Sequence, residues 1–343
     1  MRAATPLIEV LRADVHESEH AGSIAVVDSS GQLIAFCGDI ERDIFTRSSL
    51  KPFQAAPFVA MGGLEQRGWG LPQLALMCAS HSGESQHVGL ARSMLADCGL
   101  EHRHLLCGCQ VPIAYTQSGR LPKADEVFSE LHNNCSGKHS GFLAACLHQG
   151  EPIDDYVAMG HPLQRRIRDS LAKALCRDQA AFKLGVDGCA APNLAMPLPQ
   201  LAQLFAVMAA EHSPEPFARV YGNAPQRCFT AMTQHPDLVS GTDRSDLGFM
   251  RIGAGDWVFK AGAEAVQAIG VRSRGLGVAI KIADGNARAM TWIVVEIFRQ
   301  LGIGDNEQKK QLQELVDRPI RNVRGDAVGS YRPVFKLKML TGE

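Results

Sequence analysis

Ser48 and Lys51 stand three residues apart, and their types and spacing are suited to nucleophilic chemistry. Residues three apart on a helix lie on the same face, one turn above each other. A neutral lysine in that place can accept the proton of a serine hydroxyl, which makes a nucleophile without histidine. Because Ser-x-x-Lys occurs by chance in many long chains, the motif alone is a hypothesis that other segments must support.

A second serine and a second lysine lie in segments that fit the same chemistry. Ser80 belongs to a polar turn over residues 78–84, where it could bind substrate or relay a proton. Lys260 opens a Lys-x-Gly sequence at the end of an expected strand. A second ammonium near Lys51, together with burial, would favour the neutral, basic form of Lys51. The alternatives are helix capping by other residues of the turn and a solvent-exposed Lys260.

Two cysteines in separate glycine-rich segments suggest a metal site. Cys135 and Lys138 stand three residues apart, and Cys189 lies in a later loop. A thiolate near a cation and a helix N-terminus is stabilised in its ionised form. The two thiols together could hold a zinc ion, with further donors from Lys138, His139 or water. Free buried thiols are the alternative, so the residues themselves leave both interpretations open.

The composition excludes several classes of function. The 343 residues include 35 Lys and Arg against 36 Asp and Glu, so there is no electrostatic basis for binding nucleic acid or an anionic membrane. The N-terminus lacks the apolar run of a signal peptide, and the longest apolar stretch, near residues 194–210, is interrupted by prolines and glutamines. Ten cysteines without a secretion signal favour a reducing compartment. We therefore expect a soluble cytoplasmic protein.

Hydrophobic periodicity and turn residues indicate where the elements lie. Alternating or apolar runs predict strands over residues 7–11, 23–27, 33–36, 181–186, 257–261, 265–271 and 277–283. Helical patterns predict helices over residues 50–61, 71–79, 85–98, 141–148, 163–176, 199–210 and 287–301. The reactive residues thus fall at helix starts, in turns between helices and at strand ends.

Strands at both ends of the chain enclose a helix-rich middle. This order predicts an α+β fold, with one antiparallel sheet flanked by helices and a helix-rich subdomain. The sheet elements come from about residues 1–45 and 250–343, and the helix-rich part from about residues 46–250. The sequence shows no internal repeat, low-complexity stretch or linker. We therefore expect residues 1–343 to form one catalytic domain.

With these segments assembled, the chain resembles the L-asparaginase II family of the Rhizobium etli type. This is the serine-dependent group whose fold is similar to that of penicillin-binding proteins and serine β-lactamases. Six segments in order carry the resemblance, which covers nearly the whole chain. They are Arg47-Ser48-Ser49-Leu50-Lys51-Pro52, Ala79-Ser80-His81-Ser82-Gly83-Glu84, Asn134-Cys135-Ser136-Gly137-Lys138-His139, Asp187-Gly188-Cys189-Ala190-Ala191-Pro192, Lys260-Ala261-Gly262-Ala263-Glu264 and Lys281-Ile282-Ala283-Asp284-Gly285.

The resemblance implies an amidohydrolase that converts L-asparagine and water to L-aspartate and ammonia. It implies two serine–lysine pairs, Ser48 with Lys51 and Ser80 with Lys260. In the expected mechanism, neutral Lys51 takes the Ser48 proton as that hydroxyl attacks the side-chain amide carbon. Backbone N–H groups would hold the oxyanion, and Ser80 would pass a proton to the departing ammonia. Water would then hydrolyse the acyl-enzyme with the same lysine as base.

The resemblance also implies a zinc ion beside the active site, held by Cys135, Lys138 and Cys189, that assists substrate binding. It further implies that L-asparagine is the partner molecule and that the chain forms a homodimer. Asp187 would contact the substrate, and either Asp187 or Glu84 could take its ammonium group. The candidate substrate-binding residues are Arg47, His81, Glu84 and Asp187.

Three other functions are compatible with the same residues. The first is a penicillin-recognising type of serine hydrolase that acts on another amide. The second is a zinc-dependent amide hydrolase, in which metal-bound water attacks. The third is a non-catalytic protein that binds an amino acid. The sequence also leaves the preference between asparagine and glutamine open, because one methylene typically changes binding by only about 1 to 3 kcal/mol.

Overall fold

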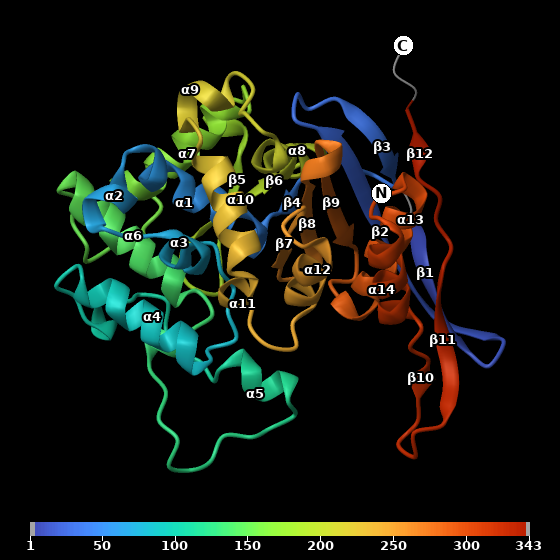
Figure 1. Cartoon of the computed structure of the whole chain (residues 1–343). Helices are drawn as coiled ribbons and strands as arrows, with labels where there is room; N and C mark the ends of the chain where they lie inside the picture. Colours follow the sequence, from blue (N-terminus) through green and yellow to red (C-terminus); the bar gives the residue numbers. More distant parts are fainter. Residues whose placement is uncertain (1–3, 341–343) are drawn as a thin grey trace.

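The computed structural model describes residues 4–340, and antiparallel strands from both ends of that range form its main sheet (Figure 1). These strands are β1 (Thr5–Arg12), β2 (Val15–Asp28), β3 (Leu33–Cys37), β7 (Trp257–Gly262), β8 (Val266–Val271), β9 (Leu276–Ile282), β10 (Ile320–Arg321), β11 (Ala327–Pro333) and β12 (Lys338–Met339). Their order is β10-β11-β1-β2-β9-β8-β7, with β3 paired to β2 and β12 paired to β3. The N-terminal hairpin therefore lies between strands from the last third of the chain.

A smaller antiparallel sheet links two of the reactive segments. It consists of β4 (Ile44–Phe45), β6 (Pro192–Met196) and β5 (Lys183–Val186), in the order β4-β6-β5. The backbone N–H of Thr46 continues this pairing by donating to the carbonyl of Leu194 at 3.0 Å. The sheet thus holds the chain just before Ser48 beside the chain that follows Cys189.

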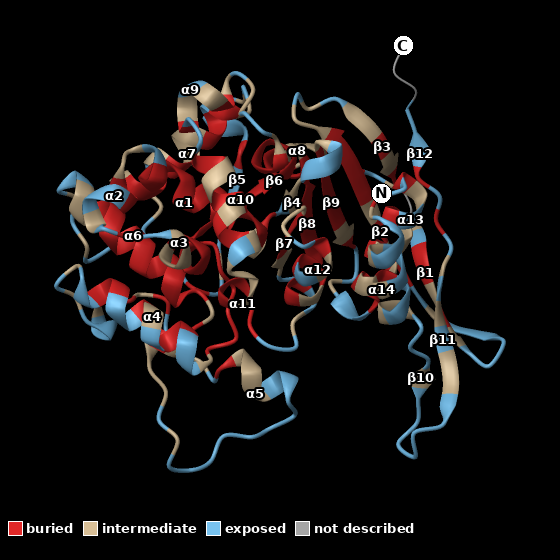
Figure 2. Ribbon diagram, in the orientation of Figure 1, coloured by how far each residue is buried: buried red, intermediate tan, exposed pale blue. Residues whose placement is uncertain are grey.

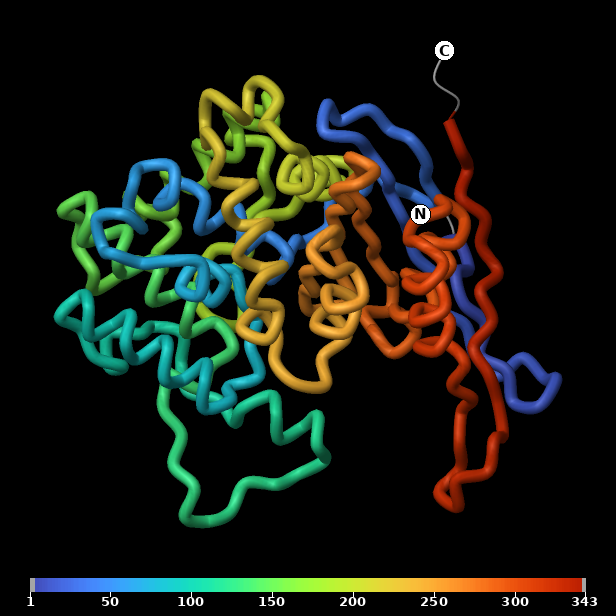
Figure 3. Tube along the Cα trace, viewed as in Figure 1, coloured from blue at the N-terminus to red at the C-terminus, as the bar shows by residue number. Residues whose placement is uncertain are grey.

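Helices occupy most of the chain between the two groups of strands. They are α1 (Lys51–Ala60), α2 (Gly63–Arg67), α3 (Leu71–Met77), α4 (Ser85–Ala96), α5 (Ile113–Gln117), α6 (Ser136–Gln149), α7 (Pro162–Ala174), α8 (Leu198–Ala209), α9 (Phe217–Tyr221), α10 (Ala224–Gln234), α11 (Pro236–Val239), α12 (Ser245–Gly253), α13 (Met290–Leu301) and α14 (Asn306–Val316). Most of them form a lobe beside the β7 edge of the sheet (Figure 1), while α13 packs against β1 and β11, and α14 packs against α13 and α12. The trace between α5 and α6 extends away from the lobe (Figure 3).

Helix α8 covers one face of the main sheet at very short range. It packs against β2, β8 and β9. A Cβ atom added at Gly277 of β9 would lie 1.9 Å from the carbonyl oxygen of Ala202 in α8. A Cβ at Gly270 of β8 would lie 3.0 Å from Val258 and 3.2 Å from Ala209. Val258 therefore faces the α8 side of the sheet.

Helix α13 covers the opposite face. Phe298 of α13 packs edge-on against Trp257 and lies 6.0 Å from the ring of Phe259. Side chains alternate between the faces along a strand. Lys260 therefore shares the face of Val258, away from α13. The buried apolar side chains form one cluster that runs from the sheet into the helical lobe (Figure 2).

The predicted α+β class is confirmed, with an antiparallel sheet and helices packed against it. Several boundaries differ from expectation. Helix α6 begins at Ser136 rather than near residue 141, and β2 begins at Val15 rather than near residue 23. The sequence patterns gave no range for β4, β6, the strands after residue 319 or the helices α2, α5, α9, α10, α11, α12 and α14. Within residues 4–340, no helix is long and apolar enough to span a membrane.

Candidate active site

The segment that carries Ser48 and Lys51 begins with a strained residue. Arg47 has a left-handed backbone with φ of 51°, which is uncommon outside glycine. Its N–H donates to Oδ1 of Asn193 at 3.1 Å, and its Nε donates to Oδ1 of Asp187 at 2.8 Å. These two bonds to the loop around Cys189 hold the conformation. A 3-10 turn over Arg47–Leu50 then leads into α1.

In a 3-10 turn, side chains at positions i and i+3 are eclipsed. The predicted helical register of Ser48 and Lys51 is therefore present, with the Lys51 N–H donating to the Ser48 carbonyl. The Ser48 hydroxyl is half-buried and makes no hydrogen bond within the part of the chain that the structure describes. The expected Ser48–Lys51 side-chain bond is thus not formed in this state.

Ser80 lies between the two lysines instead. Its Oγ is 2.8 Å from Nζ of Lys51 and 2.9 Å from Nζ of Lys260. All three residues are buried, with exposed fractions of 4% for Ser80 and 1% for each lysine. Lys51 also donates to the carbonyl of Ala79, and Lys260 donates to that of Ala261. The expected Ser80–Lys260 pair is present, and Lys51 joins it.

Two ammonium groups on one hydroxyl oxygen repel each other strongly in a buried site. Burial, and then the charge of Lys51, lower the pKa of Lys260 from 10.5 to about 7. Asp246 acts in the opposite direction, and Arg244 adds to the lowering. At neutral pH the site therefore contains a neutral amine in a substantial fraction of molecules. A neutral amine can accept the Ser80 hydroxyl proton.

The end of β7 brings Lys260 close to the Ser48 turn. Gly262 allows this approach, because a Cβ atom there would lie 3.0 Å from the carbonyl oxygen of Thr46. The lysine from the last third of the chain thus reaches a serine and a lysine from its first quarter. No local sequence pattern encodes that distance.

His81 and Glu84 have structural partners. His81 is fully buried, with Nδ1 accepting from the N–H of Gly83 at 3.1 Å and Nε2 lying 2.9 Å from Oγ of Ser136. Burial holds its pKa well below the usual value, so it is neutral. The Glu84 carboxylate accepts from the backbone N–H of Thr242 at 2.7 Å. These contacts position the Ser80 turn, and neither side chain adjoins the Ser80–lysine cluster through a hydrogen bond.

Asp187 is tied to Arg47 rather than free. Burial opposes its charge, but Lys138 and Arg47 outweigh that effect, so its pKa is lowered. Its Oδ1 also accepts from the N–H of Gly188 at 2.9 Å. Arg47 and Asp187 therefore form a largely buried ion pair, with side-chain exposed fractions of 23% for Arg47 and 12% for Asp187.

The three predicted zinc ligands come together. Nζ of Lys138 donates to Sγ of Cys189 at 2.9 Å. A hydrogen bond from Cys189 holds the pKa of Cys135 well below its usual value against the effect of burial, and Lys51 and Lys138 contribute. Burial opposes the charge of Lys138, but the two cysteines raise its pKa above the usual value. The group is therefore a thiolate with a lysine counter-charge.

His139 adds an unpaired nitrogen to this group. Its Nδ1 lies 2.7 Å from the hydroxyl of Tyr156, whereas its buried Nε2 has no partner within residues 4–340. Burial lowers its pKa to about 4, so the ring is neutral. Thiolates and neutral imidazoles are the ligands that Zn²⁺ prefers. The residue types present thus suit a zinc ion, but within residues 4–340 the ligand atoms of Cys135, Cys189 and His139 do not all lie within 4.8 Å of one another.

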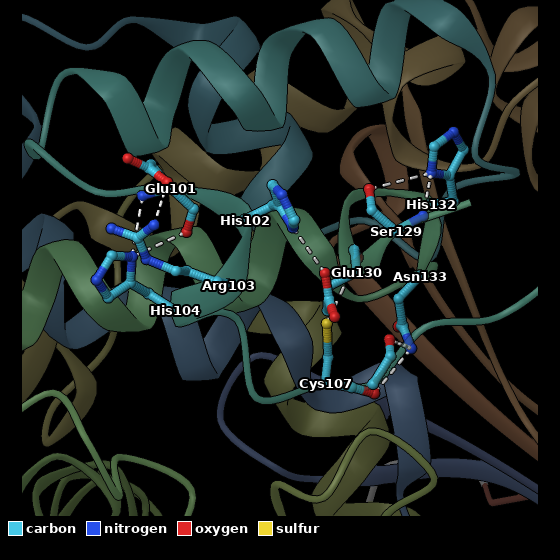
Figure 4. A network of polar contacts seen from close by, with 10 residues as sticks. Glu101, His102, Arg103, His104, Cys107, Ser129, Glu130, His132 and Asn133 are labelled. Atoms are coloured by element: carbon cyan, nitrogen blue, oxygen red, sulfur yellow. Dashed lines mark hydrogen bonds and ion pairs between the residues drawn. The ribbon is translucent and has the colours of Figure 1, made fainter. Parts of the chain in front are cut away.

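A polar network anchors the loop that precedes Cys135 (Figure 4). Nδ2 of Asn133 donates to the carbonyl of Cys107 at 2.9 Å, and its Oδ1 accepts from the N–H of Cys135 at 2.9 Å. Sγ of Cys107 contacts the carbonyl of Glu130, whose carboxylate lies 2.9 Å from Nδ1 of His102. Cys107 therefore serves packing and loop anchoring, as its apolar neighbours indicate.

The described residues also bring together Cys146, Glu151 and His161, with ligand atoms within 4.8 Å of one another. Sequence spacing did not point to this cluster. One Glu151 oxygen already pairs with Arg166. His161 accepts from the N–H of Leu163 through Nδ1, and its Nε2 faces the carbonyl of Pro152. Both imidazole nitrogens are thus engaged and an arginine supplies the positive charge, so the group fits a structural ion pair better than a metal ion.

An open cleft of about 570 Å³ lies beside the Ser48 segment. Its walls contain both basic and acidic side chains, namely Arg42, Arg47, Lys281, Asp39, Asp43 and Glu264. Both lysines of the Ser80 cluster are buried and are not part of the cleft walls. A cleft with both signs of charge matches a zwitterionic ligand. Arg47, the residue before Ser48, lines this cleft, whereas Ser48 and Ser80 do not.

An antiparallel sheet with flanking helices, with a buried serine–lysine cluster beside a charged cleft, indicates a hydrolase. Comparison with known families then identifies the family: residues 8–333 match L-asparaginase II. The chain belongs to the L-asparaginase II family and is an L-asparagine hydrolase.

Solved structures give weaker likenesses. One is a candidate β-lactamase from Bacteroides dorei, with 13% sequence identity and a TM-score of 0.44, covering 81% of this chain and 93% of that one. Another is a β-lactamase from Mycobacterium bovis, with 12% identity and a TM-score of 0.32, covering 82% of this chain and 95% of that one. The comparison with curated protein sequences gives no match.

Proposed function

We propose that this L-asparaginase acts through an acyl-enzyme on Ser48, with Lys51, Ser80 and Lys260 carrying the proton of that serine. The observation that carries the proposal is the position of Ser80 Oγ, within 2.9 Å of both lysine Nζ atoms. Ser48 is the half-buried member of the group and Ser80 a buried one. The half-buried hydroxyl is the more accessible of the two to a substrate, whereas the buried one is suited to relay.

In the proposed mechanism the Ser48 proton is replaced stepwise along the relay and the net proton acceptor is Lys260. Neutral Lys260 accepts the Ser80 hydroxyl proton, Ser80 takes a proton from Lys51, and Lys51 takes the proton of Ser48. Ser48 Oγ forms a bond to the side-chain amide carbon, and the carbonyl becomes an oxyanion held by backbone N–H groups. When the carbon–nitrogen bond breaks, the relay runs in reverse and delivers a proton to the leaving ammonia. Water repeats the cycle and releases L-aspartate.

The relay differs from the sequence-based expectation in one respect. That expectation made Lys51 the neutral base, with Lys260 lowering its pKa. In the structure the lysine with the lowered pKa, at about 7, is Lys260. Lys51 is still the lysine that stands three residues after Ser48, on the same side of the turn. We therefore propose that Lys51 passes the proton on and that Lys260 is the final acceptor.

For substrate binding we propose Arg47 and Asp187. The two side chains form an ion pair, and Arg47 lines the charged cleft. The α-carboxylate of L-asparagine matches the guanidinium, and the α-ammonium matches the carboxylate. On binding, the Arg47–Asp187 pair would be replaced by two pairs, one between Arg47 and the substrate carboxylate and one between Asp187 and the substrate ammonium. No buried charge would then be left unpaired. Glu84 and His81 would act indirectly, by holding the turn that contains Ser80.

We also propose a zinc ion at Cys135, Lys138 and Cys189. The thiolate character of Cys135 and the unpaired His139 Nε2 support it. Lys138 would have to lose its proton to become a ligand, and the charge of the metal would replace its counter-charge to the thiolate. When bound, zinc would supply positive charge that helps to hold an anionic group of the substrate.

The assembly and cellular context are further parts of the proposal. Family resemblance supports a homodimer, and the composition of the chain, with ten cysteines that the structure leaves as free thiols, supports a cytoplasmic location. The continuous apolar cluster supports one catalytic domain over the whole chain.

The test is ammonia release from L-asparagine by the wild-type protein, Ser48→Ala and Ser80→Ala. Turnover should vanish in S48A and fall by about 10²-fold or more in S80A, since proton transfer typically contributes 10²- to 10⁴-fold. Mass spectrometry of S80A after mixing with substrate should show the acylated peptide around Ser48. Activity that survives in S48A but is lost with a chelator would instead identify the zinc-dependent hydrolase.

A further inference from the structure

Asp246 is a buried carboxylate behind the proposed active site that no sequence motif pointed to. It is the second residue of α12 and only 2% exposed. Its Oδ2 accepts from the backbone N–H of Ala261 at 2.7 Å, and its Oδ1 accepts from Nε2 of Gln267 at 3.1 Å. Burying a charged group is unfavourable unless hydrogen bonds compensate it, so its persistence here needs a reason.

The two partners of Asp246 stand opposite each other in the β7–β8 ladder. Ala261 pairs with Gln267, one residue after the pair that contains Lys260. Strand β7 is at the edge of the sheet, so one side of its backbone has no strand to pair with. At Ala261, the Asp246 carboxylate accepts the backbone N–H hydrogen bond that a further strand would otherwise accept. It therefore fixes the backbone at the residue that follows Lys260.

Charged and titratable groups from several elements face Lys260. Lys51 lies at the start of α1 and Arg244 precedes α12, while Cys135, in the loop before α6, and Cys78, at the end of α3, interact with Lys260 electrostatically. Asp246 is the carboxylate among these groups, and its charge acts to raise the pKa of Lys260. Lys51 and Arg244 act to lower it. The protonation of Lys260 is thus set by opposed neighbours.

We propose that Asp246 is a positioning residue for Lys260, which holds the strand end that carries this lysine and supplies the negative charge behind its amine. Because Asp246 touches neither the cleft nor Ser80, it would act through Lys260 alone. The inference rests on the proposed role of Lys260 as the final proton acceptor.

The test is the pH profile of kcat/KM for L-asparagine in Asp246→Asn. The amide keeps one acceptor for the Ala261 N–H but removes the charge. The rising limb of the profile should move to lower pH by about 1 unit, since a nearby opposite charge typically shifts a pKa by 1 to 3 units. The plateau kcat should fall between about 3- and 100-fold, because misplacing a reacting group has effects of that size, with KM changed by less than about twofold.

Two further variants sharpen the interpretation. Arg244→Gln removes a charge of the opposite sign and should move the limb to higher pH. Asp256→Asn is the matched control, since Asp256 also accepts two hydrogen bonds, from the N–H and Oγ of Ser273, but lies on the turn that leads into β7. Its profile should match that of the wild type.

A D246N limb that stays in place, whatever the plateau rate, would overturn the proposal. A D246N protein without a cooperative unfolding transition would overturn it as well, because the residue would then be needed for the fold itself. If the wild-type limb is absent or S48A retains activity, the proposed mechanism fails first, and the two failures are therefore distinguishable.

Discussion

Replacement of Lys260 by methionine should make the protein more stable and inactive. The lysine is buried, and its pKa falls from 10.5 to about 7 on folding. A difference of one pKa unit corresponds to about 1.4 kcal/mol between the two protonation states. The protonated lysine therefore destabilises the folded state by about 5 kcal/mol below pH 7. Methionine has a similar length and no charge, so the variant removes this cost.

The same substitution removes two hydrogen bonds. Lys260 donates to Ser80 at 2.9 Å and to the carbonyl of Ala261 at 2.7 Å. Each bond contributes about 1 kcal/mol net. K260M should therefore be more stable than the wild type by about 3 kcal/mol at pH 6.

The sign of the pH dependence follows from linkage. Between pH 7 and 10.5 the unfolded chain binds a proton at Lys260 that the folded chain does not, so wild-type stability rises with pH. The advantage of K260M should shrink by about 1.4 kcal/mol per pH unit over that range. At pH 9 about 2 kcal/mol of the lysine cost remains, which the lost hydrogen bonds offset.

The assay is equilibrium urea unfolding at pH 6, 7, 8 and 9, followed by circular dichroism. Lys173 lies exposed on α7, so Lys173→Met provides the control and should differ from the wild type by an amount that does not depend on pH. A K260M protein that is less stable than the wild type at pH 6 would contradict the lowered pKa of Lys260. A stability difference that stays constant across the four pH values would contradict it as well.

Three further outcomes are expected. The kcat/KM of the wild type should rise with pH through about 7 as Lys260 loses its proton, and a flat profile from pH 6 to 9 would contradict that role. Gly277→Ala should lower the free energy of unfolding, measured in urea, by about 3 kcal/mol or more, because the new methyl group meets the Ala202 carbonyl. Gly248→Ala is the control, since open space surrounds Gly248, and it should change the free energy of unfolding by less than about 1 kcal/mol. Cys189→Ala should reduce bound zinc, measured by elemental analysis, from one per chain to none, while exposed Cys176→Ala keeps it.

The local elements were predictable where one period dominates the sequence. Residues 257–283 alternate in polarity and contain glycines at the turns, and the three strands there match the prediction closely. Their neighbours in the sheet could not be predicted. Strand β9 pairs with β2, about 250 residues earlier, and nothing in either sequence names the partner.

Helix α6 shows how glycine can mislead. The segment Ser136–Ser140 consists of small and polar residues, which predicts a loop. In the structure it is the first part of a helix that lies directly on α3, and a Cβ atom at Gly137 would lie 2.4 Å from the carbonyl of Leu76. The glycine permits close packing of two helices rather than a turn. Such a use depends on tertiary contact and leaves no local sign.

The same limit applies to the site. The sequence supplied the types of residue, and the structure brings Ser80, Lys51 and Lys260 together. Which lysine becomes the weaker base depends on burial and on Asp246 and Arg244, neither of which belongs to a motif. The sequence predicts His81 as a substrate-binding residue, and in the structure its side chain is fully buried and hydrogen-bonded to Gly83 and Ser136.

The order of strands also bears on how the chain is made. The N-terminal hairpin β1–β2 finds its neighbours β9 and β11 only after most of the chain has been translated. At about 5 to 20 residues per second, its edges remain unpaired on the ribosome for tens of seconds. Unpaired edges invite aggregation, so this interval is when the nascent protein needs protection. A transcript truncated before residue 257 would yield Ser48, Lys51 and Ser80 without their third partner.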